Sequence, residues 1–210
     1  MKKTLSILLA LCLIIGLTAC SGGNNSDEPA ENENEQAAAE EQTDNDASGN
    51  SGNETLVVYF SATGNTKAVA EKIASITGAD IYEINAAQEY TEADLDWNDS
   101  DSRTTHEQND ATVRPEIGSD PVSLEGYKTI YIGYPIWWGE EPRIMDTFVE
   151  SYDFGDITMI PFCTSGGSGI GRSGQNLADN AGSGNWLEGA RFSDGASEDD
   201  LRSWIEGLNQ

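Results

Sequence analysis

The segment SATGNT, Ser61–Thr66, gathers side chains that can hold a phosphate group. Ser61, Thr63 and Thr66 offer hydroxyl groups. Asn65 adds an amide, and the segment comes directly before a stretch with helical periodicity. The N–H groups and the positive dipole end of a helix N-terminus favour an anion. Taken alone, the same residues also fit an ordinary capped helix start.

The segment lacks the features of loops that transfer phosphate. Lys67 follows the last threonine, so the Gly-Lys-Ser/Thr order of nucleoside triphosphatases is absent. Gly64 is its only glycine, so it is not a G-x-G-x-x-G motif either. Neutral donors suit a phosphate monoester that is bound and left intact. The segment therefore favours phosphate binding over phosphoryl transfer.

Two later segments could hold a flat ring. Trp137 and Trp138 are adjacent in PIWWG, and an indole can stack on a planar ligand, although both could instead cover a sheet. We expect one to belong to the core and the other to meet a ligand. The segment Thr164–Gly171 contains four glycines, which let a backbone approach a flat ligand closely. A merely flexible loop is the alternative.

The elements that must position these segments alternate between apolar runs and amphipathic stretches. This alternation predicts a parallel sheet with helices on both faces. The three segments each follow a strand, and the carboxyl ends of parallel strands meet at one edge of the sheet, so we expect them to lie together. Strands are expected at 55–60, 80–85, 128–133, 157–163 and 186–192, and helices at 65–78, 141–152, 171–182 and 197–208.

Residues Ala86–Pro121 interrupt this alternation with an acidic, polar stretch. We expect a long excursion with a short helix around Thr91–Trp97. The acids between 94 and 101 match no calcium loop, and the chain has no Cys/His cluster, so no metal site is predicted. His106, the only histidine, is expected at the surface. If the excursion builds a pocket, its candidate lining residues are Tyr90, Trp97, Arg103 and His106.

The segments SATGNTKAVA, YPIWWGEEPRIMDTF and PFCTSGGSGIG together resemble the three FMN-contacting loops of the flavodoxin family. The resemblance spans about residues 55–210. It implies an α/β fold with an open five-stranded parallel sheet of order 2-1-3-4-5, and FMN as cofactor. The phosphate would lie on the first loop and the isoalloxazine ring between the other two. The implied cofactor-binding residues are Ser61, Ala62, Thr63, Gly64, Asn65 and Thr66; Pro135, Ile136, Trp137, Trp138 and Gly139; and Thr164, Ser165, Gly166, Gly167, Ser168 and Gly169.

The sequence departs from the family pattern at three places. Many family members carry acidic residues in the third loop, whereas this loop is uncharged until Arg172. The excursion is not standard. The chain also begins with a basic start and a short apolar run, typical of an export signal.

The run ends in Leu17-Thr18-Ala19-Cys20, which resembles a bacterial lipobox. We expect a signal peptide at 1–20, lipid on Cys20 and anchoring at the outer face of the bacterial cell membrane. Residues 21–54 hold ten acidic residues and no basic or aromatic ones, which predicts a disordered tether before the domain at 55–210. Cys163 is then the only cysteine of the folded part, and its apolar surroundings predict a buried thiol.

The formal charge of −26 argues against nucleic acid as a partner and suits a basic redox partner. Two functions remain open. The first is an electron carrier between redox partners, and the second is an FMN-dependent oxidoreductase that reduces quinones or similar small acceptors. A flavin-binding lipoprotein without turnover is a third possibility. No catalytic acid, base or nicotinamide motif stands out, which favours the carrier, and no catalytic residue is predicted.

Overall fold

The structure, a computed structural model, describes residues 52–208. The expected signal peptide, the Cys20 lipid site and nearly all of the expected tether lie outside the described residues. Within 52–208, no helix has the length and apolar character needed to cross a membrane.

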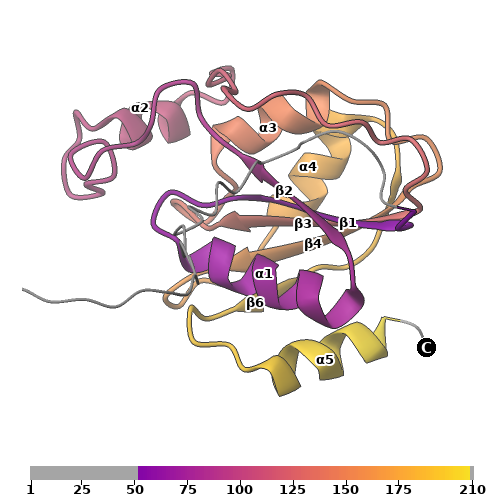
Figure 1. The fold of residues 1–210 in the computed structure, drawn as a ribbon. Helices are drawn as coiled ribbons and strands as arrows, with labels where there is room; N and C mark the ends of the chain where they lie inside the picture. Colours follow the sequence, from indigo (N-terminus) through magenta and orange to yellow (C-terminus); the bar gives the residue numbers. More distant parts are fainter. Residues whose placement is uncertain (1–51, 209–210) are drawn as a thin grey trace, which may run out of the picture. The chain divides into compact units, whose positions relative to one another are not determined.

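The sheet has the strand order β2-β1-β3-β4-β5, with β6 also paired to β4, and every pairing is parallel (Figure 1). This confirms the expected order 2-1-3-4-5. The strands are β1 (Thr55–Phe60), β2 (Asp80–Ile84), β3 (Thr129–Pro135), β4 (Thr158–Thr164), β5 (Asn185–Trp186) and β6 (Ala190–Phe192).

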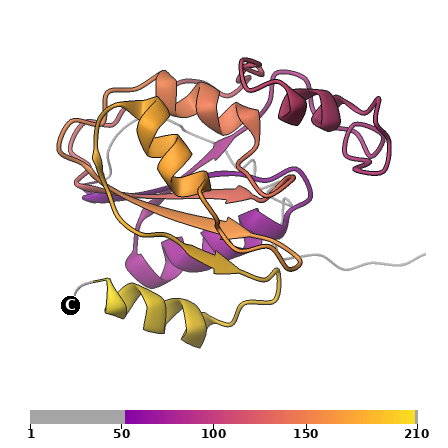
Figure 2. The ribbon, with the colours of Figure 1, turned by 180° about the vertical axis from the view of Figure 1, so that it is seen from behind.

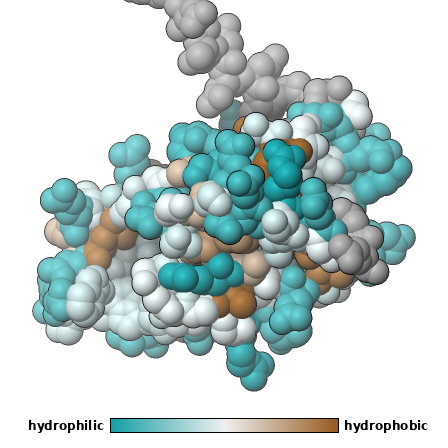
Figure 3. Space-filling view, turned by 90° about the horizontal axis from the view of Figure 1, so that it is seen from below, coloured by the Kyte–Doolittle hydropathy of each residue, from teal (hydrophilic) through white to brown (hydrophobic). Residues whose placement is uncertain are grey.

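Helices cover both faces of the sheet (Figures 1 and 2). One face carries α1 (Asn65–Thr77) and α5 (Glu198–Gly207). The other carries α3 (Arg143–Glu150) and α4 (Ser173–Ala181). Seen from the side of α1 and α5, the surface is mostly hydrophilic with small hydrophobic patches (Figure 3).

The alternation of side chains along β1 divides the core into two clusters. Leu56, Val58 and Phe60 belong to the cluster that contains the apolar side chains of α3 and α4. Val57 and Tyr59 belong to the cluster that contains those of α1 and α5. Strands buried on both faces need near-continuous apolar runs, which is what made them recognisable in the sequence.

The expected strand at 186–192 is split into β5 and β6. Gly189 lies in the break, where a Cβ atom would come within 2.5 Å of the Pro161 carbonyl oxygen and of Ile170 Cδ1. The backbone at Gly189 therefore lies too close to Pro161 of β4 and to Ile170 for a side chain to fit, and the strand is interrupted there.

The helix expected at Thr91–Trp97 is wrong: this stretch forms turns. The Thr91 N–H donates to Asp94 Oδ2 (2.9 Å), and the Asp94 N–H donates to Thr91 Oγ1 (3.2 Å). These reciprocal bonds cap a single turn, which the Leu95 N–H closes by donating to the Thr91 carbonyl (3.1 Å) and which does not continue as a helix. The excursion instead forms α2 (Arg103–Asn109), whose N-cap Ser102 accepts from the Thr105 N–H.

Candidate functional site

Three loops meet at the carboxyl edge of the sheet, as their order in the sequence predicts. They are residues 61–64 after β1, 136–142 after β3 and 165–172 after β4, called here the hydroxyl loop, the tryptophan loop and the glycine loop. Thr66 Oγ1 and Thr164 Oγ1 share a buried hydrogen bond of 2.8 Å, which ties the start of α1 to the end of β4. The Ile136 N–H donates to the Thr164 carbonyl (2.9 Å), which ties in the tryptophan loop.

The hydroxyl loop leaves donors available at the start of α1. Gly64, the N-cap, has φ +85°, and no side chain caps the helix. The first turn of α1 contains no acid, whereas α5 begins with the side-chain cap Ser197 and three acids. Ser61 Oγ is buried and has no hydrogen-bond partner among residues 52–208. An anion with several acceptor oxygens would satisfy this hydroxyl and the free N–H groups together.

The side chains of Thr63 and of the first turn of α1 have three different environments. Thr63 and Asn65 are exposed and line a pocket. The Thr66 hydroxyl is engaged with Thr164 and is buried. Lys67 turns away from the loop and donates to Glu83 Oε2 on β2 (3.1 Å). The donors that Thr63 and the first turn of α1 offer to this pocket are thus neutral.

A pocket of about 260 Å³ lies between the three loops, and we call it the inter-loop pocket. All but one of its lining residues are among those implied by the family resemblance. The exception is Asp194, which follows β6. Its lining residues are Thr63, Asn65, Pro135, Ile136, Trp137, Thr164, Ser165, Gly166 and Asp194.

The tryptophan loop contains a tight reverse turn. Trp137 and Glu140 exchange N–H to carbonyl hydrogen bonds of 2.9 and 3.0 Å. The two residues between them have positive φ, +52° for Trp138 and +88° for Gly139, which is the pattern of a type I′ turn. Trp138 is the only non-glycine residue with positive φ in the described part of the chain. Such strain is concentrated at functional sites.

The two tryptophans have different environments, and only Trp137 lines the inter-loop pocket. The Trp137 ring packs edge-on against Phe60 (5.7 Å between centroids) and Tyr90 (5.3 Å). Its carbonyl accepts from Gln108 Nε2 of α2 (3.0 Å). The Trp138 side chain is 47% exposed. Trp137 is therefore a fixed wall, and Trp138 is available to a ligand.

A second pocket, of about 350 Å³, adjoins the inter-loop pocket, and we call it the excursion pocket. It shares Thr63, Ile136 and Trp137 with the inter-loop pocket. The excursion supplies Leu95, Trp97 and Thr104 to its wall, and Trp138 completes it.

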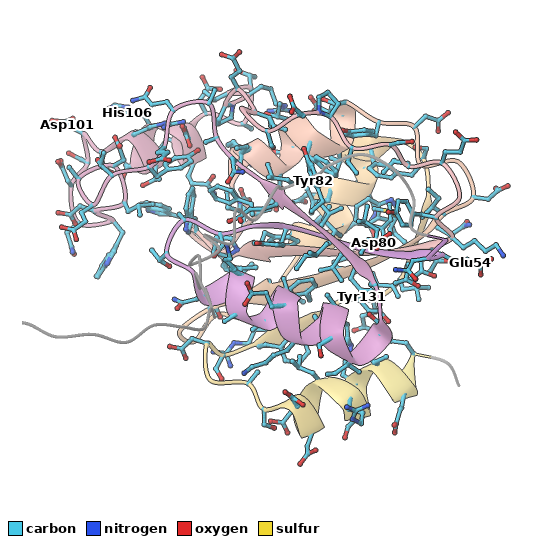
Figure 4. All side chains as sticks on the ribbon, viewed as in Figure 1. Glu54, Asp80, Tyr82, Asp101, His106 and Tyr131 are labelled. Carbon is cyan, nitrogen blue, oxygen red and sulfur yellow. The ribbon has the colours of Figure 1, made fainter. Side chains whose placement is uncertain are left out.

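Of the four residues expected to line an excursion pocket, only Trp97 does so. Tyr90 packs behind Trp137. Arg103 lies over the Tyr90 ring, 3.9 Å from its centroid, and donates to Glu107 Oε1 (2.7 Å). His106 is exposed on α2, away from the sheet, as expected (Figure 4).

A buried acid connects the tryptophan loop to α4. Glu141 Oε2 accepts from Asn176 Nδ2 (3.2 Å), while Oε1 has no hydrogen-bond partner among the described residues. Arg143 Nη1 lies 3.9 Å from that oxygen. The pKa of Glu141 is raised to about 7, mainly by burial and also by the nearby Asp146, against the opposing effects of its backbone hydrogen bond, Asn176 and Arg143. Glu141 thus gains or loses a proton near neutral pH beside the candidate site.

Sequence reasoning missed the charged residues beside the glycine loop. Arg191 of β6 donates from Nε to Ser165 Oγ (3.0 Å) and from Nη2 to the Ser165 carbonyl. Asp194 follows on the same side. Both come from the end of the last strand. The rule that parallel strands end at one edge could have identified them, but their segment has no recognisable ligand motif.

The remaining reactive groups do not form a second site. Cys163 is buried, as expected, and burial raises its pKa to about 12. Within residues 52–208, no group of three or more His, Cys, Asp or Glu side chains is placed to hold a metal ion.

A family model described as flavodoxin matches residues 54–208. A protein from Bacteroides eggerthii DSM 20697, provisionally described as a flavoprotein, has a crystal structure with a TM-score of 0.70. It is 43% identical, and the alignment covers 75% of this chain and 98% of that one. A similarly described protein from Bacteroides uniformis ATCC 8492 is 46% identical over 73% of this chain and 97% of its own, also with a TM-score of 0.70.

A flavoprotein from Lactobacillus acidophilus NCFM, crystallised in complex with FMN, has the same fold. It has a TM-score of 0.59 and 23% identity, over 75% of this chain and 99% of that one. No curated protein matches the chain.

Proposed function

Because this chain belongs to the flavodoxin family, we propose that it binds FMN at the three loops and carries electrons between redox partners. The observation that carries the proposal is the buried Ser61 hydroxyl without a partner, at the start of an uncapped helix beside the inter-loop pocket. A phosphate at this point would receive hydrogen bonds from Ser61 and from the N–H groups of α1. FMN, when bound, supplies the electron-transfer chemistry.

The inter-loop pocket suits the flavin ring. Trp137 and Ile136 form one wall, and Ser165 and Gly166 form the other. A Cβ atom added at Gly166 or Gly167 would meet nothing within 4 Å. Packing within the protein does not require glycine there, which fits close approach by a ligand. The Lactobacillus acidophilus flavoprotein, with the same fold, holds FMN.

The family's electron-carrier role requires partners that dock near the flavin. Acidic residues far outnumber basic ones in this chain, 37 against 11. The structure places much of this charge on exposed surface, as at Asp96, Asp99 and Asp101 of the excursion. A basic partner protein is therefore the expected docking partner.

The amino-terminal segment adds a location to this proposal. Lipid on Cys20 and a tether over residues 21–54 would hold the FMN domain at the outer face of the bacterial cell membrane. Replacing Cys20 with Ala should abolish incorporation of labelled fatty acid and release the protein from membranes. Membrane retention of Cys20→Ala without lipid would refute the anchor and leave FMN binding untouched.

The experiment that tests the central proposal is a spectroscopic titration. Purified protein mixed with FMN and passed through a desalting column should retain flavin absorption bands, and reductive titration should resolve two one-electron steps. Absence of retained flavin would overturn the proposal.

The excursion pocket favours a second candidate, an FMN-dependent oxidoreductase that reduces quinones or similar small acceptors. The pocket adjoins the inter-loop pocket and would place a small molecule beside the ring. Rapid oxidation of a nicotinamide with a quinone as acceptor, and a single two-electron step on reduction, would favour this function over the carrier.

A further inference from the structure

We propose that the excursion pocket binds a flat, uncharged aromatic molecule of the naphthoquinone class. The inference rests on the proposed function, since this pocket shares Thr63, Ile136 and Trp137 with the inter-loop pocket where FMN is proposed to bind. It concerns an adjoining cavity, to which the excursion adds Leu95, Trp97 and Thr104.

The excursion is fixed to the tryptophan loop at several points. Gln108 Nε2 donates to the carbonyls of Trp137 (3.0 Å) and Glu141 (3.2 Å). Arg143 of α3, itself buried, donates to the carbonyls of Glu107 (3.4 Å) and Gln108 (3.3 Å) at the end of α2. The two sides of the pocket are therefore held at a set separation.

The outer wall is also held internally. Thr104 Oγ1 donates to the Asp94 carbonyl (2.6 Å), and the Thr104 N–H donates to the same oxygen (3.1 Å). These bonds join the turn that carries Leu95 and Trp97 to α2. The turn at 91–97 thus has a defined position although it is not a helix.

The lining indicates an aromatic ligand. Trp97 is 73% exposed and Trp138 is 47% exposed, and both line the pocket. Two large apolar rings left in water are unfavourable unless a partner covers them. Leu95, Ile136 and Trp137 complete an apolar surface of a size that accommodates a small ligand.

The lining favours an uncharged ligand. No Lys, Arg, Asp or Glu lines it. The excursion cation Arg103 is not among the lining residues, and its guanidinium is paired with Glu107 and stacked on Tyr90. The carboxylate of Asp94 accepts from the N–H and the hydroxyl of Thr91 and is not among the lining residues. Two hydroxyl groups belong to the lining residues. The Thr63 hydroxyl can donate to a neutral carbonyl oxygen, whereas the Thr104 hydroxyl already donates to the Asp94 carbonyl.

The test is equilibrium dialysis of menadione, a neutral methylnaphthoquinone, against the FMN-loaded, oxidised full chain. Trp97→Ala and Trp138→Asn should each raise the Kd for menadione about tenfold, a change typical of losing one aromatic stacking partner. Asn tolerates the positive φ of position 138, so the turn is retained. Leu187→Ala removes an exposed apolar side chain (41%) outside the pocket and should leave this Kd unchanged.

The FMN affinity of each variant, measured in parallel, separates the outcomes. Trp97→Ala should bind FMN as the unaltered protein does. An unchanged menadione Kd in both tryptophan variants overturns the proposal. Equal weakening of menadione and FMN binding by Trp97→Ala also overturns it, because the flavin ring would then occupy this pocket. If the protein retains no FMN, the proposed function fails. Menadione binding to the FMN-free chain then tests the pocket separately. Weaker binding by Trp97→Ala would support the proposal, and equal binding would overturn it.

Discussion

Thr66 and Thr164 share a buried hydrogen bond that joins the first turn of α1 to the end of β4. Their Oγ1 atoms lie 2.8 Å apart, and both residues are almost fully buried. The Thr164 carbonyl also accepts from the Ile136 N–H (2.9 Å). The hydroxyl, tryptophan and glycine loops are therefore held together at one residue, and the spacing between the phosphate donors and the ring walls depends on it.

Replacing either threonine with valine should destabilise the FMN-free protein. Valine keeps the shape but leaves the other hydroxyl buried without a partner, so the free energy of unfolding should fall by about 1–3 kcal/mol. The double variant Thr66→Val/Thr164→Val should lose less than the sum of the two, because it removes both polar groups. Urea unfolding measures all three, and strictly additive losses would mean that the hydrogen bond contributes nothing.

Ser61→Ala should weaken FMN binding without lowering the stability of the FMN-free protein. The Ser61 hydroxyl is buried without a partner, so its removal should leave the stability of the FMN-free protein unchanged or slightly higher. FMN affinity should fall by about tenfold or more, since a hydrogen bond to a charged group contributes about 1.5–3 kcal/mol. Fluorescence titration of FMN measures the affinity. Ser203→Ala on α5 is the matched control, and equal FMN affinity in both variants would refute phosphate binding at Ser61.

Glu141 should make the protein less stable as pH rises. The unfolded chain releases this proton near the model value of 4.5, whereas the folded protein keeps it up to about 7. Between these values the folded state binds more protons, so the free energy of unfolding decreases with pH, and the loss is complete above about 7. A shift of this size corresponds to roughly 3 kcal/mol.

Glu141→Gln removes this titration and nearly preserves the shape of the side chain. Its free energy of unfolding should exceed that of the unaltered protein at about pH 8 and approach it at about pH 5. Urea unfolding at both pH values measures the difference, with the exposed Glu206→Gln as control. The same advantage at both pH values would show that Glu141 does not titrate in this range.

The sequence predicted the elements whose signal is local. Thr55–Phe60 was placed with its observed bounds because a strand buried on both faces must be apolar throughout. The break at Gly189 was missed because it depends on Pro161 of the neighbouring strand. The helix α2 was missed because its residues are polar, and tertiary bonds from Arg143 to the carbonyls of Glu107 and Gln108 hold it in place.

The same distinction applies to the candidate site. The family motifs predicted nearly the whole lining of the inter-loop pocket, because its loops are continuous in the sequence. Asp194 and Arg191 reach the site only through the course of β6, and Leu95 and Thr104 only through the turns of the excursion. Contacts between distant segments carry no local pattern.

Arg191 should raise the reduction potential of bound FMN. Its guanidinium holds Ser165 of the glycine loop, whereas many family members have acids in this loop. A positive charge beside the ring pocket favours the extra negative charge of reduced flavin. Because Arg191 is exposed, water weakens the effect to about 1 kcal/mol or less. For a two-electron couple, this is on the order of 20 mV.

Arg191→Gln should therefore lower the midpoint potential, as measured by spectroelectrochemistry. Arg202→Gln on α5 removes the same charge from the helix that covers the sheet and should change the potential less. Arg191→Lys keeps the charge but loses the paired hydrogen bonds to Ser165. A potential close to that of the unaltered protein in the lysine variant would assign the effect to charge. A drop equal to that of Arg191→Gln would instead assign it to the position of the glycine loop, and no drop in either variant would contradict the prediction.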